Sequence, residues 1–306
     1  MNRNQEIALC FYRNGQDDVA TGKMLGVTPS TIRRAVRRFK QTDKPQTPAK
    51  IFITDIETAQ MIVKVWQLRK NDFIQHHRII KDWFVMMWTG KWLLSNEVLG
   101  DCVTPAESIA RDDSRILESI WKLLNSADII VGHNVKNFDL KKLNARFLKY
   151  RQLPPSPYNV VDTLHQSRQN FGFSSHKLDF ITGYLELPQK LETNIDLWDK
   201  CEEGDIKALN EMFEYCKNDV VINEEVYIEL LPYMKSHPNV RLFSDMGVEG
   251  CPNCGSTDIE KLETFYVTPA NKYPSFRCNA CGKPSHSRTS IVSTEQRKNL
   301  LSSDAK

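Results

Sequence analysis

The sequence predicts an α/β protein in which a mixed β-sheet flanked by helices carries a small all-helical module before it and a small cysteine-rich module after it. Residues 51–243 alternate strand-like and helix-like stretches, residues 1–41 contain helical patterns, and two Cys-x-x-Cys pairs lie in residues 244–292. With 306 residues, of which 41% are hydrophobic, the chain is long enough for an enzymatic core with one or two appendages.

Charge is unevenly distributed along the chain. Residues 1–50 contain ten Lys and Arg against four Asp and Glu, and residues 250–306 contain eight against five. The whole chain contains 41 Lys and Arg and 38 Asp and Glu, so residues 51–249 hold 23 basic and 29 acidic residues. Basic ends around an acidic centre suit a chain whose flanks touch phosphate and whose centre binds cations.

No stretch of 18 or more uncharged apolar residues occurs, so we expect no membrane span. The first residues lack an apolar signal core and a small-residue cleavage site. We therefore expect a cytoplasmic protein, or one that acts in the cytoplasm of a host.

The helical patterns of residues 1–41 are separated by short glycine turns. The last predicted helix starts with Thr28 as its N-cap and Pro29 at its first helical position. Helix, glycine turn and helix in this order resemble a helix-turn-helix. Residues 42–50 contain two prolines and no large apolar residue, so we expect a linker there.

The helix after Thr28 is the expected DNA-binding element, since base contacts concentrate near the start of the second helix in this motif. Its arginines would meet phosphates in a salt-sensitive and sequence-blind way. The alternative is a helical module with a solvated basic face that binds protein. The expected DNA-binding residues are Thr28, Ser30, Thr31, Arg33, Arg34 and Arg37. A single module of this kind binds weakly and would tether the enzyme near its substrate.

Strand-like stretches come first in residues 51–243 and then alternate with helical ones, which indicates a mixed sheet with helices on its faces. The stretches with strand patterns are 51–56, 60–68, 82–89, 92–99 and 128–134, and 159–166 is predicted to be a strand or a strand-to-helix turn. The stretches with helical patterns are 106–127, 136–150 and 205–234.

Two carboxylates lie one residue apart at the end of the first predicted strand. Asp55 and Glu57 point to the same face of the strand, and Ile56 points the other way. Taken alone, the pair would be a solvated strand end. Two carboxylates on one face are also a natural site for Mg²⁺, which prefers oxygen ligands.

Two later stretches carry further side chains that suit such a metal site. HNVKNFD places Asp139 a turn into a predicted helix, and YCKND places Tyr215 and Asp219 on one helix face. Each has a structural alternative, because Asp139 could be a first-turn residue favoured by the helix dipole and Tyr215 could simply pack. Phosphodiester hydrolysis needs an activated water and charge relief at phosphorus, which two divalent ions about 3.5–4 Å apart can supply with about four carboxylate ligands.

The stretches DIET, HNVKNFD and YCKND resemble, in this order, the three motifs of the DEDD exonuclease superfamily, which has a ribonuclease H-like fold. A tyrosine four residues before the last aspartate matches the DEDDy branch. The resemblance covers about residues 51–235, and the wider layout is similar to stand-alone 3′–5′ exonucleases of bacteriophages. It implies a two-metal-ion 3′–5′ exonuclease that releases mononucleotides from DNA, with single-stranded or frayed ends as the expected substrate.

The resemblance also implies roles for individual residues. Two Mg²⁺ or Mn²⁺ ions would be held by Asp55, Glu57, Asp139 and Asp219. Asp55 would bridge both ions, and Glu57 and Tyr215 would orient the attacking water. Asn134 matches an asparagine that positions substrate in the second family motif, and Asp162 resembles a family position behind the site.

Four of the eight cysteines form two Cys-x-x-Cys pairs with twenty-three residues between them, namely Cys251, Cys254, Cys278 and Cys281. In a cytosolic chain this pairing indicates a metal site in preference to two disulfides. Four thiolates make a closed tetrahedral Zn²⁺ site, so this zinc would be structural. CPNCG and CNACG resemble zinc-ribbon knuckles, which predicts a zinc ribbon over residues 244–292 and a polar tail over residues 293–306.

Two other functions are compatible with parts of the sequence. A transposase or integrase also joins a helix-turn-helix to a ribonuclease H-like core, but its acidic triad usually lacks the initial Asp-x-Glu and the tyrosine. A non-catalytic DNA-binding regulator would not need all four carboxylates and the tyrosine intact. No polymerase region is present, so a proofreading role would require a separate polymerase or another replication or recombination protein as partner.

Overall fold

The computed structural model describes residues 6–8, 10–11, 15, 17–42, 49–67, 74–191, 193–244 and 247–302. The chain forms two compact units, one made of residues 50–228 and the other of the two ends of the chain, residues 1–49 and 229–306. The first unit contains the predicted mixed sheet. The second contains the N-terminal helices and the cysteine-rich module.

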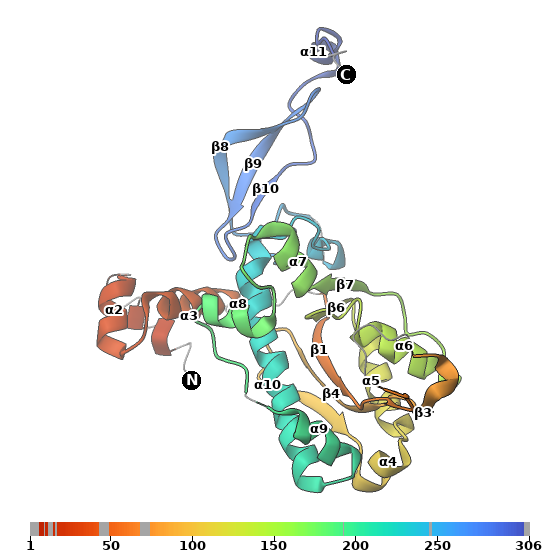
Figure 1. Cartoon of the computed structure of the whole chain (residues 1–306). Helices are drawn as coiled ribbons and strands as arrows, with labels where there is room; N and C mark the ends of the chain where they lie inside the picture. The colour runs from red at the N-terminus through yellow and green to blue at the C-terminus, as the bar shows by residue number, and fades with distance from the viewer. Residues whose placement is uncertain are drawn as a thin grey trace. The chain divides into compact units, whose positions relative to one another are not determined.

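A five-stranded sheet is the centre of the first unit, with strand order β5-β4-β1-β6-β7 (Figure 1). Its strands are β1 (Ile51–Thr58), β4 (Val85–Trp92), β5 (Leu99–Cys102), β6 (Ile129–Gly132) and β7 (Asn159–Asp162). The first three pair antiparallel as a meander, and β6 and β7 run parallel to β1. This confirms the predicted mixed sheet, in which the meander comes first and the helices follow.

Helices cover both faces of this sheet. They are α4 (Pro105–Ala110), α5 (Ser114–Ser126), α6 (Asp139–Lys149), α7 (Thr163–Asn170), α8 (Leu178–Tyr184), α9 (Ile195–Glu202) and α10 (Ile206–Leu230). On β4, the Trp88 indole donates to the Ile116 carbonyl of α5 at 3.0 Å, and the Thr89 hydroxyl donates to the Cys216 carbonyl of α10 at 2.9 Å. Adjacent strand residues face opposite sides, so α5 and α10 lie on opposite faces, as Figure 1 shows.

Two predicted strands differ from the structure. Of residues 60–67, only Ile62–Val63 form a strand, the short β2, and residue 68 of the predicted strand lies outside the described residues. β2 pairs with β3 (Ile79–Lys81) in a separate two-stranded ribbon beside the 3₁₀ helix η1 (His76–Arg78). Of residues 92–99, Trp92 ends β4, Leu99 begins β5, and residues 93–98 form the turn between them. That turn contains Leu94 at a positive φ of 66°, and its N–H donates to Glu224 at 2.7 Å. A buried carboxylate on α10 therefore stabilises a turn that the apolar pattern did not reveal.

The helix predicted over residues 106–127 is divided into α4 and α5. Arg111 ends α4 in the left-handed region, with φ 56°. Asp113 then precedes α5, and its buried carboxylate accepts hydrogen bonds from Arg146 at 2.5 and 2.7 Å and from the Val85 N–H at 2.9 Å. A buried carboxylate needs such partners, and a continuous helix would not present Asp113 to them.

The second unit begins with short helices. Residues 6–8 and 10–11 are helical, and α2 (Asp18–Leu25) and α3 (Pro29–Thr42) follow. Asp17 caps α2 by accepting from two N–H groups at 2.9 Å, and Gly26 ends it at φ 65°, a conformation that glycine adopts without strain. A small buried core joins the helices, made of Ile7, Ala8, Ile32, Ala35 and Val36.

The C-terminal part of this unit is a three-stranded antiparallel sheet with strand order β10-β9-β8. Its strands are β8 (Ile259–Val267), β9 (Lys272–Cys278) and β10 (Pro284–His286), and the 3₁₀ helices η2 (Leu231–Tyr233) and η3 (Val240–Phe243) precede it. The predicted polar tail contains a short helix, α11 (Thr294–Lys298), which begins with a capping box between Ser293 and Gln296. Within the described part of the chain, no helix has the length and apolar character needed to cross a membrane.

Candidate active site

The carboxylates of β1 lie on the sheet face that α10 covers. β1 pairs with β6 over its first three residues only, so the strand continues past the end of its parallel neighbour. On its other side, Asp55 lies opposite Thr89 of β4, whose hydroxyl bonds to α10. Residues opposite each other in a ladder point to the same face. Asp55 and Glu57 therefore both point towards α10, as their spacing predicts.

Three carboxylates meet at this edge of the sheet. Asp55 and Glu57 from β1 and Asp219 from α10 offer oxygen atoms that all lie within 4.8 Å of one another. Tyr215, one turn before Asp219 on α10, is 6% exposed. Folding thus brings together residues that are far apart in the sequence.

Asp139 reaches the same edge from α6. It is the first residue of that helix, whereas the sequence placed it a turn inside. Its carboxylate accepts a hydrogen bond at 3.1 Å from the N–H of Ile56, the residue between Asp55 and Glu57. The side chain is 2% exposed, and its charge raises the pKa of Asp55. Asp139 therefore lies beside the three clustered carboxylates and acts on them electrostatically.

The pKa values of all four carboxyls are raised. Burial is the main cause in each case, and repulsion between the carboxylates adds to it at Asp55 and Glu57. The pKa of Asp55 lies well above its usual range, that of Glu57 is raised to about 8 and that of Asp139 to about 7. Ionised carboxylates this close together in a buried site are unfavourable without a counter-charge. The cluster therefore favours a bound cation at neutral pH.

One oxygen of this cluster lacks a protein partner. Among the described residues, Oδ1 of Asp219 is buried and has no hydrogen-bond partner, whereas Oδ2 accepts from the Lys190 ammonium at 2.6 Å. Buried polar atoms are normally satisfied in native structures. An unpartnered carboxylate oxygen next to two further carboxylates fits a cation ligand.

Lys190 is a site residue that the sequence analysis missed. Its ammonium bonds Asp219 and lies 4.6 Å from the centre of the Tyr215 ring. Burial opposes the charged form of Lys190, yet Asp219 and Tyr215 raise its pKa. The residue lies between α8 and α9 in a stretch without periodic pattern, so nothing in the sequence connected it with the three motifs.

Asn134 lies in the turn between β6 and α6, at a positive φ of 66°. Its N–H donates to Asp162 at 3.0 Å, and the N–H of Lys136 donates to the same carboxylate at 3.1 Å. Asp162 also caps α7. Asp162 thus holds the turn that leads to Asp139, which agrees with the supporting position that the resemblance implied.

The expected DNA-binding residues of α3 are partly engaged with the protein itself. The Thr28 hydroxyl accepts from the Thr31 N–H at 3.2 Å, as expected of an N-cap, and lies 2.6 Å from the Ser30 hydroxyl. Arg33 forms an ion pair with Asp18 of α2, although 62% of its side chain is exposed. Arg34 is half-buried, and the side chain of Arg37 lies outside the described part of the structure.

The four cysteines form a compact cluster in the second unit. Their sulfurs all lie within 4.8 Å of one another, and the Cys251–Cys281 and Cys254–Cys278 sulfurs are 3.6 Å apart. Tetrahedral zinc with Zn–S bonds of about 2.3 Å places sulfurs about 3.8 Å apart, much further than the roughly 2.0 Å of a disulfide. Each pair is followed by a glycine with positive φ, 77° at Gly255 and 84° at Gly282. The cluster can hold zinc.

A comparison with protein families identifies the central fold. Residues 100–231 match a family described as the RNase_H superfamily. The central domain is ribonuclease H-like. The match includes Asp139 and Asp219 but begins after β1, so it does not include Asp55 and Glu57.

A search of solved structures finds the family B DNA polymerase from the hyperthermophilic archaeon Pyrobaculum calidifontis. The sequences are 17% identical, the TM-score is 0.44, and the alignment covers 60% of this chain and 25% of the polymerase chain. This chain therefore spans a quarter of the length of that polymerase. No curated protein sequence matches the chain.

Proposed function

We propose that the chain is a metal-dependent 3′–5′ exonuclease that releases mononucleotides from DNA, with single-stranded or frayed ends as substrate. The observation that carries this proposal is the set of Asp55, Glu57 and Asp219 oxygens within 4.8 Å of one another, with Asp219 buried and Asp55 and Glu57 half-buried. The ribonuclease H superfamily match supports it, because such domains are typically metal-dependent nucleases. The three sequence motifs supply the finer assignment to 3′–5′ exonucleases.

The donor set fits Mg²⁺ or Mn²⁺. Every group offered is a carboxylate oxygen, which hard divalent cations prefer, and the unpartnered Oδ1 of Asp219 is available to one. In this proposal two ions are held by Asp55, Glu57, Asp139 and Asp219. Bound there, they would lower the pKa of water and offset the negative charge that develops at phosphorus.

The remaining roles belong to the side chains around the carboxylates. Burial raises the pKa of Tyr215, so its phenol keeps its proton at neutral pH and can donate a hydrogen bond to the attacking water. The Trp198 indole N–H lowers the pKa of the Glu57 carboxyl, and the Trp198 ring lies 6.1 Å from that of Tyr215 in an edge-on contact. Trp198 would thus hold in place the two residues proposed to orient the water. Asn134 would position the substrate strand.

The flanking modules have supporting roles in this proposal. The basic helix α3 would contact DNA through Thr28, Ser30, Thr31, Arg33, Arg34 and Arg37. The cysteine cluster would hold one structural zinc. A polymerase or another replication or recombination protein would be the partner if the enzyme proofreads.

One assay separates the proposal from its alternatives. Single strands labelled at the 5′ or the 3′ end are incubated with the protein in Mg²⁺ and in EDTA. Stepwise metal-dependent shortening from the 3′ end is the expected result. Strand joining or specific nicking would indicate a transposase or integrase, and binding without degradation would indicate a regulator.

The zinc assignment has its own test. Native mass spectrometry is expected to find one zinc ion per chain, because four thiolates within 4.8 Å form a closed site. Cys278→Ser should lose this ion and lower the melting temperature of the second unit. Cys10→Ser, outside the cluster, is the matched control and should keep it. Wild-type protein that contains no zinc and is as stable as the same protein with zinc added would contradict the assignment.

A further inference from the structure

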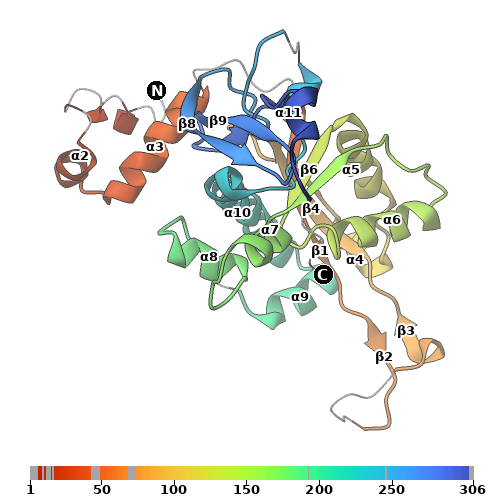
Figure 2. The same cartoon turned by 90° about the horizontal axis from the view of Figure 1, so that it is seen from above.

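A separate two-stranded ribbon leaves the first unit directly after the strand that carries Asp55 and Glu57. It comprises residues 61–67 and 74–81, with β2 and β3 as its paired strands. Figure 2 shows it projecting away from the helices and the five-stranded sheet. The ribbon is not needed to complete the sheet, since β1 pairs with β4 and β6 on its two sides.

The ribbon exposes large apolar side chains on both strands. Trp66 is 89% exposed, and the others with more than two fifths of their surface exposed are Met61, Ile62, Val65, Ile74 and Ile80. A two-stranded ribbon alone buries too little to be stable in water. A tryptophan left almost entirely in water, among further apolar groups, marks a surface for interaction.

The charges of the ribbon identify the kind of partner. Its described residues carry Lys64, Arg78 and Lys81 and no Asp or Glu. Lys64 follows β2 and Arg78 ends η1, and the Lys64 N–H donates to the Arg78 carbonyl at 2.9 Å. The Arg78 guanidinium lies 5.4 Å from the centre of the Trp66 ring. Proteins bind single strands without sequence preference by placing an aromatic ring, on which any base can stack, beside cations.

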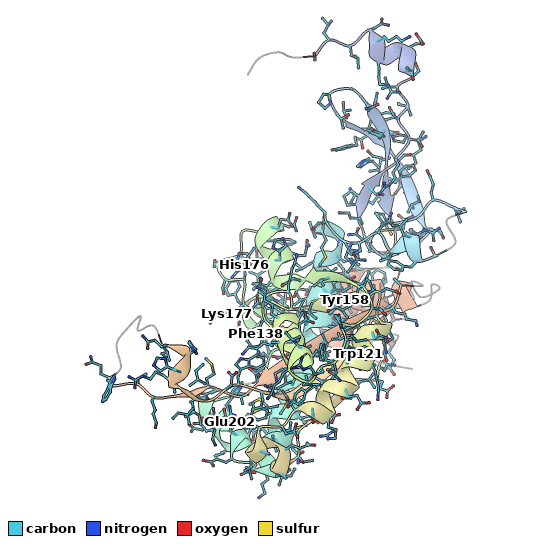
Figure 3. All side chains as sticks on the ribbon, turned by 90° about the vertical axis from the view of Figure 1, so that its right-hand side faces the viewer. Trp121, Phe138, Tyr158, His176, Lys177 and Glu202 are labelled. Carbon is cyan, nitrogen blue, oxygen red and sulfur yellow. The ribbon has the colours of Figure 1, made fainter. Side chains whose placement is uncertain are left out.

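The base of the ribbon is firmly attached. The Gln60 N–H donates to Glu202 of α9 at 2.6 Å, and Arg111 donates to Glu202 at 2.6 Å, to the Gln60 carbonyl at 2.5 Å and to the Asp82 carbonyl at 2.9 Å. Arg111 thus joins both strands of the ribbon to α9, and Figure 3 labels Glu202 near this base. The attachment keeps the ribbon in a fixed relation to β1 and its carboxylates.

We propose that this ribbon binds a single-stranded nucleic acid, with Trp66 stacked on a base and Lys64, Arg78 and Lys81 at phosphates. Phosphates are repelled by the carboxylate cluster, so a strand that enters the site needs cations close by. That this strand is the substrate of the acidic site rests on the proposed function. The binding itself does not depend on cleavage, so the two can be tested separately.

The test measures binding of fluorescein-labelled oligothymidylate by anisotropy in EDTA. Trp66→Ala should weaken binding about ten-fold, because stacking on one base is worth roughly this much, and Trp66→Phe should restore most of it. Leu153→Ala is the control, since Leu153 is also a largely exposed apolar residue, at 77%. Unchanged melting temperatures show that the variants are folded.

The cations are tested through salt dependence. The double variant Lys64→Ala/Lys81→Ala should reduce the slope of log K against log salt by about 1.4, since each phosphate contact on a single strand contributes about 0.7. The matched double variant Lys122→Ala/Lys149→Ala removes two exposed lysines elsewhere in the unit and should leave the slope unchanged.

The outcomes separate the two proposals. Thymidine 5′-p-nitrophenyl phosphate is a single nucleotide, so its hydrolysis by the wild type tests the acidic site without the ribbon. Failure of that hydrolysis would remove the proposed function and leave the binding result standing. Wild-type affinity in Trp66→Ala, or an unchanged salt slope in the lysine variant, would overturn the ribbon proposal and point to a protein partner.

Discussion

Two sets of buried or half-buried charges lie around the same sheet, and they differ in whether the protein supplies the opposite charge. Lys91 and Glu224 form an ion pair of 2.7 Å with side chains 6% and 0% exposed, and it links β4 to α10. Arg146 and Asp113 form a second, at 2.5 Å and with two hydrogen bonds. Among the described residues, Asp55, Glu57, Asp219 and the adjacent Asp139 have one such partner, Lys190, which forms a salt bridge with Asp219 alone.

The comparison shows why burial by itself does not identify a site. A buried charge with a geometric partner is part of the scaffold, and its partner explains its presence. A cluster of one sign that is buried or half-buried, with raised pKa values and an unpartnered oxygen, indicates a site for a ligand of the opposite charge.

Removing one carboxylate of the unpaired cluster should have the largest effect. Asp55→Asn is expected to reduce cleavage of single-stranded DNA by about 10³-fold or more, because metal-ion catalysis supplies several kcal/mol. The same variant should leave the metal-free protein at least as stable as the wild type at pH 8, since it removes repulsion. Asp101→Asn on β5, which lies outside the cluster, is the control for cleavage. Retained turnover in Asp55→Asn would refute its proposed role.

Breaking a compensated pair should act on stability instead. Arg146→Met leaves Asp113 buried without its cation, so the free energy of unfolding in urea should fall by about 3–5 kcal/mol. Asp113→Asn added to this variant should recover part of the loss. Arg115→Met breaks ion pairs in which the arginine is 46% exposed and should lose about 1 kcal/mol or less. Equal losses in the two arginine variants would contradict the comparison.

The pH dependence of stability should reveal the unpaired cluster. Burial raises the pKa of Glu57 from 4.5 to about 8, so the folded metal-free protein binds more protons than the unfolded chain between these values. This contribution is complete below about pH 4.5 and is lost as the pH rises through about 8. We expect on the order of 3 kcal/mol less stability at pH 8 than at pH 5 in EDTA.

Two controls test whether the carboxylate cluster causes this loss of stability. Glu57→Gln should flatten the dependence, and saturating Mn²⁺ should restore stability at pH 8, because the cation compensates the ionised carboxylates. A wild-type profile that Glu57→Gln and Mn²⁺ both leave unchanged would show that the cluster is not the source.

Lys190 should give the smallest effect. Lys190→Met removes the ammonium that forms an ion pair with Asp219. Because the Lys190 side chain is 30% exposed, the free energy of unfolding at pH 8 in EDTA should fall by about 1 kcal/mol. Saturating Mn²⁺ should reduce the difference in free energy of unfolding between this variant and the wild type. A loss as large as that of Arg146→Met would place Lys190 among the scaffold pairs.

The sequence predicted the elements whose apolar pattern is local. The prediction failed where a residue far along the chain determines the local structure. The strand of residues 51–56 and the helix of residues 205–234 follow from apolar periodicity and were found in place. The strand predicted over residues 92–99 failed because Glu224, far along the chain, accepts from the Leu94 N–H and stabilises a turn there. Residues 60–68 have an apolar pattern that suits a core strand, but both neighbouring positions beside β1 are taken by β4 and β6.

By itself the sequence determined which side chains are candidates for the proposed chemistry: the acidic residues of three motifs with Tyr215, and the cysteine pairs that end in glycine knuckles. The spacing is two residues between Asp55 and Glu57, four between Tyr215 and Asp219, and three within each cysteine pair. The backbone geometry of a strand, a helix and a knuckle brings residues at these spacings close together. The tertiary structure alone decided which charges are compensated. It placed Arg146 on Asp113 and Lys190 on Asp219, and it left the Oδ1 of Asp219 without a partner among the described residues. The reason is physical: the pKa of a carboxyl depends on burial and on charges within a few ångströms, and the folded chain alone sets those distances.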